Sequence, residues 1–429
     1  MPAPQAPREL ELRRTFTGAA FLSFQPLLLN ALSVPVLAYI IRRLGAEAYG
    51  QWMIATALMA VFTILANLGL RGVFVRRVAR QPQEAEAALG EQLGLRVALG
   101  IASSVAALLL AAALGYPGVV LGCVAISAIG LLAATVATTL SDLLQATHRL
   151  RSLAGVNLAS GLALTVTSFL VALAGAGPLE MAAAYLVGPF VALLLAARLV
   201  AQQGIAIRPS FGFAAGKRLL AGSRHFAAQQ VLSTCSSHAE SLILPRLAGA
   251  IELGFFSAGS LMASRLTAFS DGLGTAAYPA MAAGFARSGA SGSIVVRFAM
   301  AAAASGLGLA ILAACIAHPL GELLFPGHSE PFTRIALITV WSLPLVGVEL
   351  ILGTALNAAG EDAAQARASL PAALVSVASA VALVAAFGAT GAAWSFLLRP
   401  AYRCLFLAPL CLRRFGRANG SLAPGGCAP

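Results

Sequence analysis

Ionisable side chains are rare in this chain, and several of them lie inside long apolar runs. Charged residues make up 10% of its 429 residues, whereas a soluble globular domain carries about 25%. A charged side chain at membrane depth costs several kcal/mol, so it usually faces protein or water rather than lipid. The arginines, carboxylates and histidines within these runs are therefore the groups that could bind or carry a charged solute.

The most polar run spans residues 219–247. Its polar side chains recur every three or four positions, so on a helix they form one stripe: His225, Gln229, Ser233, Ser236 and Glu240, with His238 beside them. Such a stripe faces a cavity or packs through its small hydroxyls against another helix. Because a carboxylate and an imidazole at this depth can titrate near neutral pH, Glu240 and His238 are candidates for proton or sodium coupling.

Three further runs carry isolated polar or charged groups. Run 253–285 holds Arg265 and Asp271, which are too far apart on a helix to pair with each other, so each needs a partner on another helix. Their two possible roles, lining a substrate path (Arg265 for binding, Asp271 for coupling) and forming structural ion pairs, stay open.

Asn67 ends the polar face of run 49–70 and is followed by Arg71, so both are candidate binding residues. Asp142 lies near the inner end of run 119–147. A salt bridge with a nearby loop arginine is its preferred interpretation, and a coupling role is the alternative.

The elements that position these groups are membrane-spanning helices. Hydrophobic residues make up 59% of the chain and the mean hydropathy is +0.86. A span needs about 20 mostly apolar residues, and in lipid each backbone group must be satisfied within its own helix. We predict an all-α polytopic membrane protein with about twelve spans: 15–41, 49–70, 93–114, 119–147, 153–174, 179–200, 219–247, 253–285, 294–317, 332–356, 370–387 and 389–412.

The distribution of basic residues predicts the orientation. Of 28 Lys and Arg residues, four lie on the predicted outer segments, namely Arg42, Arg43, Arg246 and Arg334, and most of the others lie on the inner ones. This bias places both termini in the cytoplasm. Arg42, Arg43 and Arg246 either snorkel to the outer interface or bind phosphate oxygens bidentately, and with Arg71 further in they could hand an anion across.

A weak repeat divides the chain into halves. Residues 42–50 and 246–254 share the pattern Arg-x-x-Gly-Ala-x-x-x-Gly, and at the same offset Asn67 corresponds to Asp271. Six spans separate the copies, so the halves have the same orientation, as in transporters with parallel repeats. We predict a six-helix lobe over 1–201, a cytoplasmic linker over 202–218, a second six-helix lobe over 219–412 and a cytoplasmic tail over 413–429.

Several classes of function are disfavoured by what the sequence contains. The net charge of +12 comes with this apolar composition, so it does not indicate nucleic-acid binding. The six cysteines have no metal-ligand spacing, and no P-loop, GxSxG or HExxH motif occurs. The short predicted outer loops do not suit a membrane glycosyltransferase or polymerase. We therefore expect no enzyme activity, no metal and no cofactor.

Several short phrases carry a family resemblance. They follow one another along the chain in this order: residues 42–52, Leu68-Gly69-Leu70 before a basic stretch, residues 143–149, Glu240 nine residues before Gly249, the segment Gly254-Phe-Phe-Ser-Ala258, and Pro279. They resemble the polysaccharide-biosynthesis, or O-antigen flippase (Wzx-type), branch of the multidrug/oligosaccharidyl-lipid/polysaccharide exporter superfamily. Phe256 stands where that family usually has Tyr, and Glu240 where it has Asp.

The resemblance implies a flippase of the bacterial inner membrane. Its expected substrate is a polyprenyl-pyrophosphate-linked oligosaccharide for O-antigen, lipopolysaccharide or a similar surface polysaccharide, moved by two lobes that alternate around a cationic cavity. Membrane lipids, a polysaccharide polymerase and glycosyltransferases are the expected partners. The alternative is a cation-coupled multidrug or small-solute antiporter with the same fold or the major facilitator fold. Residues 69–77 faintly resemble a facilitator loop but lack its central Asp.

Overall fold

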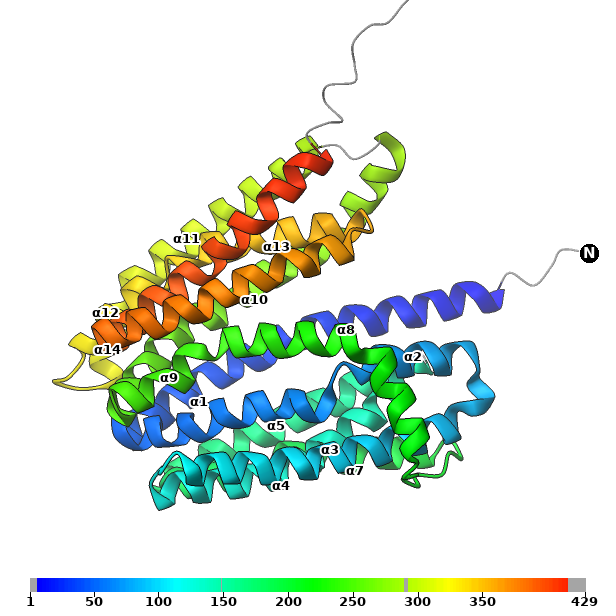
Figure 1. Ribbon diagram of the computed structural model, residues 1–429, viewed down its shortest axis with the longest axis horizontal. Helices are drawn as coiled ribbons and strands as arrows, with labels where there is room; N and C mark the ends of the chain where they lie inside the picture. Colours follow the sequence, from blue (N-terminus) through cyan, green and yellow to red (C-terminus); the bar gives the residue numbers. More distant parts are fainter. Residues whose placement is uncertain (1–5, 148, 289–291, 416–429) are drawn as a thin grey trace, which may run out of the picture. The chain divides into compact units, whose positions relative to one another are not determined.

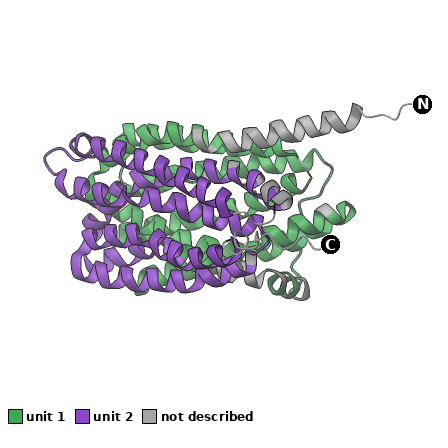
Figure 2. Ribbon diagram, turned by 90° about the horizontal axis from the view of Figure 1, so that it is seen from above, with its two compact units in different colours: residues 1–234 green, residues 235–429 purple. Residues whose placement is uncertain are grey.

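The computed structural model describes residues 6–147, 149–288 and 292–415. Within them the chain forms helices joined by turns and short connections, without strands (Figure 1). The chain divides into two compact units, residues 1–234 (unit 1) and 235–429 (unit 2), coloured separately in Figure 2. The boundary between Thr234 and Cys235 falls inside helix α8 (Phe213–Ser237).

Within its described residues, unit 1 contains seven complete α-helices, a short 3-10 helix and most of α8: α1 (Ala6–Asn67), α2 (Leu70–Arg80), η1 (Pro82–Glu84), α3 (Ala85–Ala113), α4 (Gly118–Ala146), α5 (Leu150–Leu173), α6 (Pro178–Ala184) and α7 (Val187–Ala201). Unit 2 contains the end of α8 and then α9 (Ala239–Leu247), α10 (Ala250–Ser288), α11 (Gly292–Leu324), α12 (Glu330–Thr339), α13 (Ser342–Ala358) and α14 (Asp362–Phe415).

Two of the longest helices are pairs of spans joined at a glycine. The backbone leaves helical geometry at Gly45 in α1 (φ 74°, ψ 174°) and at Gly388 in α14 (φ 56°, ψ −133°), conformations that residues with a Cβ rarely adopt. Figure 1 shows α1 reversing direction at its left end. Gly249, which matches Gly45 in the sequence repeat, lies between α9 and α10 and also has a positive φ of 90°.

The helices confirm a polytopic all-α membrane protein. Eight described segments are long and apolar enough to cross a membrane. Two of these, Leu28–Val78 and Ala363–Phe415, include the Gly45 and Gly388 turns and so hold two spans each. Together with α8–α9 and α10 these segments account for every predicted run within the described residues. The predicted tail 413–429 lies outside those residues from 416 onwards.

The predicted run 219–247 is not one continuous helix. It breaks at His238, so Glu240 lies in the first turn of α9 rather than in the middle of a single span. The Ser236-Ser237 pair at the end of α8 is a weak helix former. A break leaves backbone carbonyls without helical partners. Arg399 of α14 supplies the missing donor: its Nη1 atom donates to the Ser237 carbonyl at 3.0 Å and to the Ser236 carbonyl at 3.5 Å.

Surface and interior follow the pattern expected in lipid. Large apolar side chains such as Leu194 (67% exposed) face outward, while Arg96 and Glu240 are buried. Helices approach closely at glycines: a Cβ on Gly306 of α11 would lie 2.7 Å from the Leu343 carbonyl oxygen at the start of α13. Small residues at helix contacts are typical of membrane bundles, because dense packing replaces the hydrophobic effect there.

Candidate functional site

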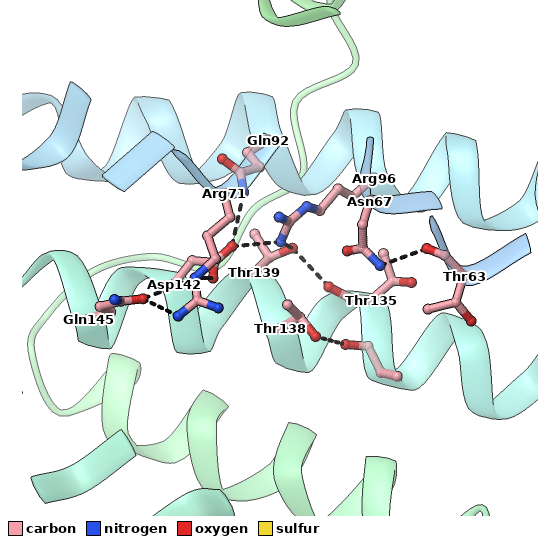
Figure 3. A network of polar contacts seen from close by, with 11 residues as sticks. Thr63, Asn67, Arg71, Gln92, Arg96, Thr135, Thr138, Thr139, Asp142 and Gln145 are labelled. Carbon is pink, nitrogen blue, oxygen red and sulfur yellow. Dashed lines mark hydrogen bonds and ion pairs between the residues drawn. The ribbon is translucent and has the colours of Figure 1, made fainter. Parts of the chain in front are cut away.

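A charged network in unit 1 joins three helices (Figure 3). Its centre is an ion pair between Arg96 of α3 and Asp142 of α4, with Arg96 Nη1 2.9 Å from Asp142 Oδ2 and side chains only 1% and 3% exposed. Two opposite charges buried at this distance stabilise each other and must stay together, because either one alone would carry an uncompensated desolvation cost. The pair therefore fixes α3 against α4 at this depth.

Neighbouring polar groups complete the environment of Arg96. Its Nη1 atom donates a hydrogen bond to the Thr139 hydroxyl at 3.2 Å, and that hydroxyl donates to the Thr135 carbonyl at 2.8 Å. An amide atom of Gln92, one helical turn before Arg96, lies 3.3 Å from both terminal guanidinium nitrogens and as an oxygen accepts from each. Arg96 Nε has no hydrogen-bond partner among the described residues. Arg96 is thus held in one position by several acceptors.

Arg71 shares the same carboxylate from the other side. Its Nε atom lies 3.4 Å from Asp142 Oδ1, and its Nε and Nη2 atoms donate to Gln145 Oε1 at 3.1 and 2.5 Å. Unlike Arg96, the Arg71 side chain is 59% exposed. Asp142 carries one negative charge against two guanidinium groups, so the network has one positive charge in excess. That excess lies on the exposed partner, Arg71.

A cavity of about 350 Å³ opens beside this exposed guanidinium. Its polar lining comes from α4 and α5 together with the network: Arg71, Thr138, Ser141, Asp142, Asn157 and Ser160. The remaining lining includes Gly161 and Gly188, against which the side chains of Leu29 and Leu164 pack closely. A guanidinium beside hydroxyl and amide groups can bind an anionic oxygen and hydrogen-bond the hydroxyls attached to it.

Unit 2 contains a buried ion pair at the helix break. Glu240 Oε2 lies 3.4 Å from Arg399 Nη1, and the Ser395 hydroxyl donates to Glu240 Oε1 at 2.9 Å. The Arg399 guanidinium also lies over the Phe396 ring, 4.7 Å from its centroid. The predicted candidate Glu240 is therefore buried and charge-compensated by an arginine of α14.

A second pair lies further along the same helix. Arg403 Nη1 of α14 is 2.8 Å from Glu349 Oε1 of α13, and both side chains are partly buried. Arg399 and Arg403 flank Pro400 within the predicted run 389–412, and the sequence allows two interpretations of them: buried partners or a misplaced helix boundary. The structure shows that both arginines have carboxylate partners inside the helix bundle. It also adds Glu349, Ser395 and Arg96 to the polar groups of the candidate site.

The other predicted site residues occupy separate places. Asn67 ends α1, where its amide donates to the Thr63 carbonyl at 2.8 Å. Arg42, Arg43 and Arg246 are exposed, and Arg43 Nε donates to the Tyr39 hydroxyl at 2.8 Å. These three residues lie close to the glycine turns of α1 and α9–α10.

His238 forms the break before α9, and Arg265 is partly buried on α10. The side chains of His225, Gln229 and Asp271 lie outside the described part of the structure. Of the predicted candidates, Arg71 and Asp142 are brought together. Asp142 does form salt bridges, but its partners lie on helices and not on a loop: Arg71 on α2 and the closer Arg96 on α3.

The fold is shared with known membrane transporters of solved structure. An inward-facing multidrug resistance MATE family transporter of the MOP superfamily matches with a TM-score of 0.72 at 14% identity, covering 92% of this chain and 96% of that one. The lipid II flippase MurJ in an inward closed conformation matches with a TM-score of 0.68 at 11% identity, covering 94% and 89%. The eukaryotic MATE transporter AtDTX14 matches with a TM-score of 0.61 at 13% identity, covering 96% and 100%.

Sequence comparison points to a specific family. No curated protein matches this chain significantly. The family model described as "Polysaccharide biosynthesis protein" matches residues 17–285, which include all of unit 1 from residue 17 onwards and the first helices of unit 2. The Arg71–Asp142–Arg96 network and Glu240 all lie within the matched residues. The chain is therefore a multi-pass membrane protein that belongs to the polysaccharide biosynthesis protein family.

Proposed function

We propose that this protein is a flippase that moves a polyprenyl-pyrophosphate-linked oligosaccharide across the bacterial inner membrane by alternating access, without covalent chemistry. Its family membership supports a role in making a surface polysaccharide such as O-antigen or lipopolysaccharide. One of the solved proteins with this fold is named a lipid II flippase. Glycosyltransferases that build the glycan and a polymerase that consumes it are the partners that such a role requires.

The observation that carries this proposal is the excess positive charge of the unit 1 network. Arg71 is exposed, and Asp142 already has the buried Arg96 as its partner. A pyrophosphate carries negative charge on oxygens that a guanidinium binds bidentately. The hydroxyl and amide groups of the adjoining cavity, such as Ser141 and Asn157, suit sugar hydroxyls. Arg71 is thus the proposed headgroup ligand, with Asn67, Arg42, Arg43, Arg246 and Arg265 as further candidates along the path.

Charge distribution supports an orientation with cytoplasmic termini. In unit 1 the basic helix α2 and the start of α8 lie at the same end (Figure 1). Exposed basic residues gather on these segments and on the linker: Arg76, Arg80, Arg208, Lys217 and Arg218. Cytoplasmic segments of membrane proteins carry such an excess of Lys and Arg. We place this end of unit 1 in the cytoplasm.

Glu240 is the proposed coupling residue. Its carboxylate holds Arg399 and Ser395, so a proton taken up by Glu240 would release Arg399 from its negative partner and shift the balance between conformations. His238, next to the break, and Asp271 and Asp142 are the other coupling candidates. Asp142 is the weaker one, because two arginines compensate it.

The alternative, a cation-coupled multidrug or small-solute antiporter, has less support. A cationic solute needs an available carboxylate, whereas Glu240 and Glu349 in unit 2 each have an arginine within 3.4 and 2.8 Å. The unit 1 network carries excess positive charge, which repels a cation. Both features favour an anionic substrate.

A transport assay in vesicles tests the proposal. Purified protein reconstituted into liposomes should move a fluorescent polyprenyl-pyrophosphate sugar between leaflets, measured by chemical quenching of the outer leaflet. Arg71→Gln should lower the initial rate about tenfold or more, because a lost charge-assisted contact to phosphate costs about 1.5–3 kcal/mol.

Arg80→Gln is the matched control, since Arg80 is also an exposed arginine of α2 but lies outside the cavity lining. It should transport at the wild-type rate. Failure with several glycans, together with efflux of a cationic dye, would reverse the order of the two functions. Equal rates for Arg71→Gln and wild type would remove Arg71 from the site.

A further inference from the structure

Unit 1 contains a second, larger cavity that the proposed transport path does not use. Its volume is about 770 Å³, within the range of roughly 300–1,000 Å³ typical of ligand pockets. It lies between α3 and the chain segment that enters α8, and its apolar lining includes Leu95, Ala98, Phe211, Leu220 and Ala221. It shares no lining residue with the cavity beside Arg71.

The wall formed by the linker is fixed to α3 by backbone contacts. The Ser210 amide donates to the Gly90 carbonyl at 2.9 Å. A Cβ on Gly94 would lie 2.2 Å from the Ser210 carbonyl oxygen, so this approach requires glycine. Beyond this contact small residues line both sides, Ala98 on α3 and Gly216 and Ala221 on α8, and they leave the cavity unfilled. The cavity is therefore a consequence of how the linker docks.

The polar end of the cavity is positively charged. Lys217 belongs to the lining, and two further basic residues nearby in the sequence, Arg218 of α8 and Arg208 of the linker, are exposed without lining the cavity. The carboxylate in the lining, Glu91, lies 2.6 Å from Arg77 Nη1, and Arg77 Nη2 also pairs with Glu84 at 3.2 Å. This cluster leaves one negative charge, which Lys217, Arg218 and Arg208 together outweigh. Phe211, also in the lining and 70% exposed, is the kind of aromatic side chain that lies at a membrane–water interface. An apolar cavity with a cationic rim matches an amphiphile with an anionic head.

We propose that this cavity binds an anionic phospholipid of the cytoplasmic leaflet, with an acyl chain between α3 and the start of α8 and its phosphate on Lys217 and Arg218. Basic pockets between helices on the cytoplasmic side bind anionic headgroups in this way. The assignment to that leaflet rests on the orientation proposed above; the chemistry of the site does not. The lipid would act as a resident ligand that holds the linker against α3, not as the transported substrate.

Native mass spectrometry of the whole protein tests this proposal. Protein taken from nanodiscs of phosphatidylglycerol should retain bound lipid through mild delipidation, and protein from phosphatidylcholine should retain much less. The Lys217→Gln/Arg218→Gln double variant should retain phosphatidylglycerol with about tenfold lower affinity, because each basic residue near an anionic headgroup contributes. Ala98→Trp should exclude the lipid by filling the cavity, since Ala98 is exposed there.

Arg198→Gln is the matched control, because Arg198 is an exposed arginine at the end of α7, a helix that contributes no residue to the cavity lining. It should retain lipid as the wild type does. The proposal is overturned if wild-type protein retains no anionic lipid, or if the double variant, Ala98→Trp and the control retain equal amounts. Occupancy by an added polyprenyl phosphate in preference to phosphatidylglycerol would also overturn it, by assigning the site to the substrate. Lipid retention is measured independently of glycan transport. A protein that fails to transport glycans can therefore still retain phosphatidylglycerol, and the two proposals can fail separately.

Discussion

Buried charges are balanced differently in the two units. In unit 1 two arginines, Arg71 and Arg96, share the single carboxylate of Asp142. In unit 2 two carboxylates each have their own arginine, Glu240 with Arg399 and Glu349 with Arg403. The unit 1 network therefore keeps an exposed positive charge, whereas each of these unit 2 pairs has no net charge.

This difference separates two uses of a charge within a membrane protein. A complete buried pair seldom adds stability over a well-packed apolar pair, but breaking it is costly. It can thus hold helices in one arrangement and release them when one partner changes charge. An incomplete network can instead attract a charged solute. We infer that unit 1 is organised for binding an anion and unit 2 for switching.

The largest expected effect follows from breaking the buried centre of unit 1. Arg96→Met should lower the free energy of unfolding by about 3 kcal/mol, because it removes the buried partner of Asp142 and leaves only Arg71, which is 3.4 Å away and 59% exposed. Thermal and denaturant unfolding in detergent would measure the loss. In the double variant Arg96→Met/Asp142→Leu most of the stability should return, since an apolar pair of similar volume replaces the ion pair. A single variant as stable as the wild type would contradict the buried pair.

Glu240→Gln is expected to have the next largest effect. It removes the negative charge but keeps the shape, so Arg399 loses a charge-assisted bond worth about 1.5–3 kcal/mol while keeping the Ser237 carbonyl. Transport should be abolished in vesicles although expression stays normal. Ser395→Ala, which removes one neutral donor from the same carboxylate, should cost less, about 1 kcal/mol. Full transport by Glu240→Gln would exclude Glu240 from coupling.

The glycine turns test whether the two units share a common backbone design. Gly45→Ala and Gly249→Ala should each lower the free energy of unfolding by about 1–2 kcal/mol, because both residues have positive φ. No nearby atom would contact the added Cβ, so the backbone conformation alone causes the loss. Their effects should therefore be similar in denaturant unfolding. Gly72→Ala in α2 is a control with the opposite sign: it also has open space but is helical, so alanine should stabilise by about 0.5–1 kcal/mol.

The smallest effect is expected for the second pair of unit 2. A double-mutant cycle with Glu349→Gln and Arg403→Gln should give a coupling energy of about 1 kcal/mol or less, because both side chains are partly accessible. The exposed Arg334–Glu330 pair, 2.6 Å apart, should give a value near zero. A coupling at Glu349–Arg403 larger than at Glu240–Arg399 would reverse the ranking of the two pairs.

Much of the fold could be predicted from hydropathy and turns, because the bilayer imposes span length and helical structure. The break at His238 could not, since it depends on Arg399, a residue far along the chain that binds the freed carbonyls. The turn at Gly388 falls at the predicted boundary between runs 370–387 and 389–412, but its φ of 56° could not be read from the sequence.

The site was predictable in part. Asp142 and Glu240 were recognised as carboxylates within predicted spans and Arg71 as a candidate just after one. Their partners Arg96, Arg399 and Ser395 were not recognised as such, because contacts between helices have no local signature. One signal could have identified Arg96. It and Asp142 are the only acidic or basic residues in the consecutive runs 93–114 and 119–147, each near the inner end. Consecutive spans are antiparallel neighbours, so opposite charges at one depth should pair.

The glycine turns also limit how this protein can rearrange. Two spans joined through a single residue, as at Gly45 and Gly388, cannot slide past each other by a helical turn of about 5.4 Å, because the connection is too short to follow. Each such hairpin must tilt or rotate as one body. The internal breaks, such as the one at His238, are then the points where a rocking movement can be absorbed.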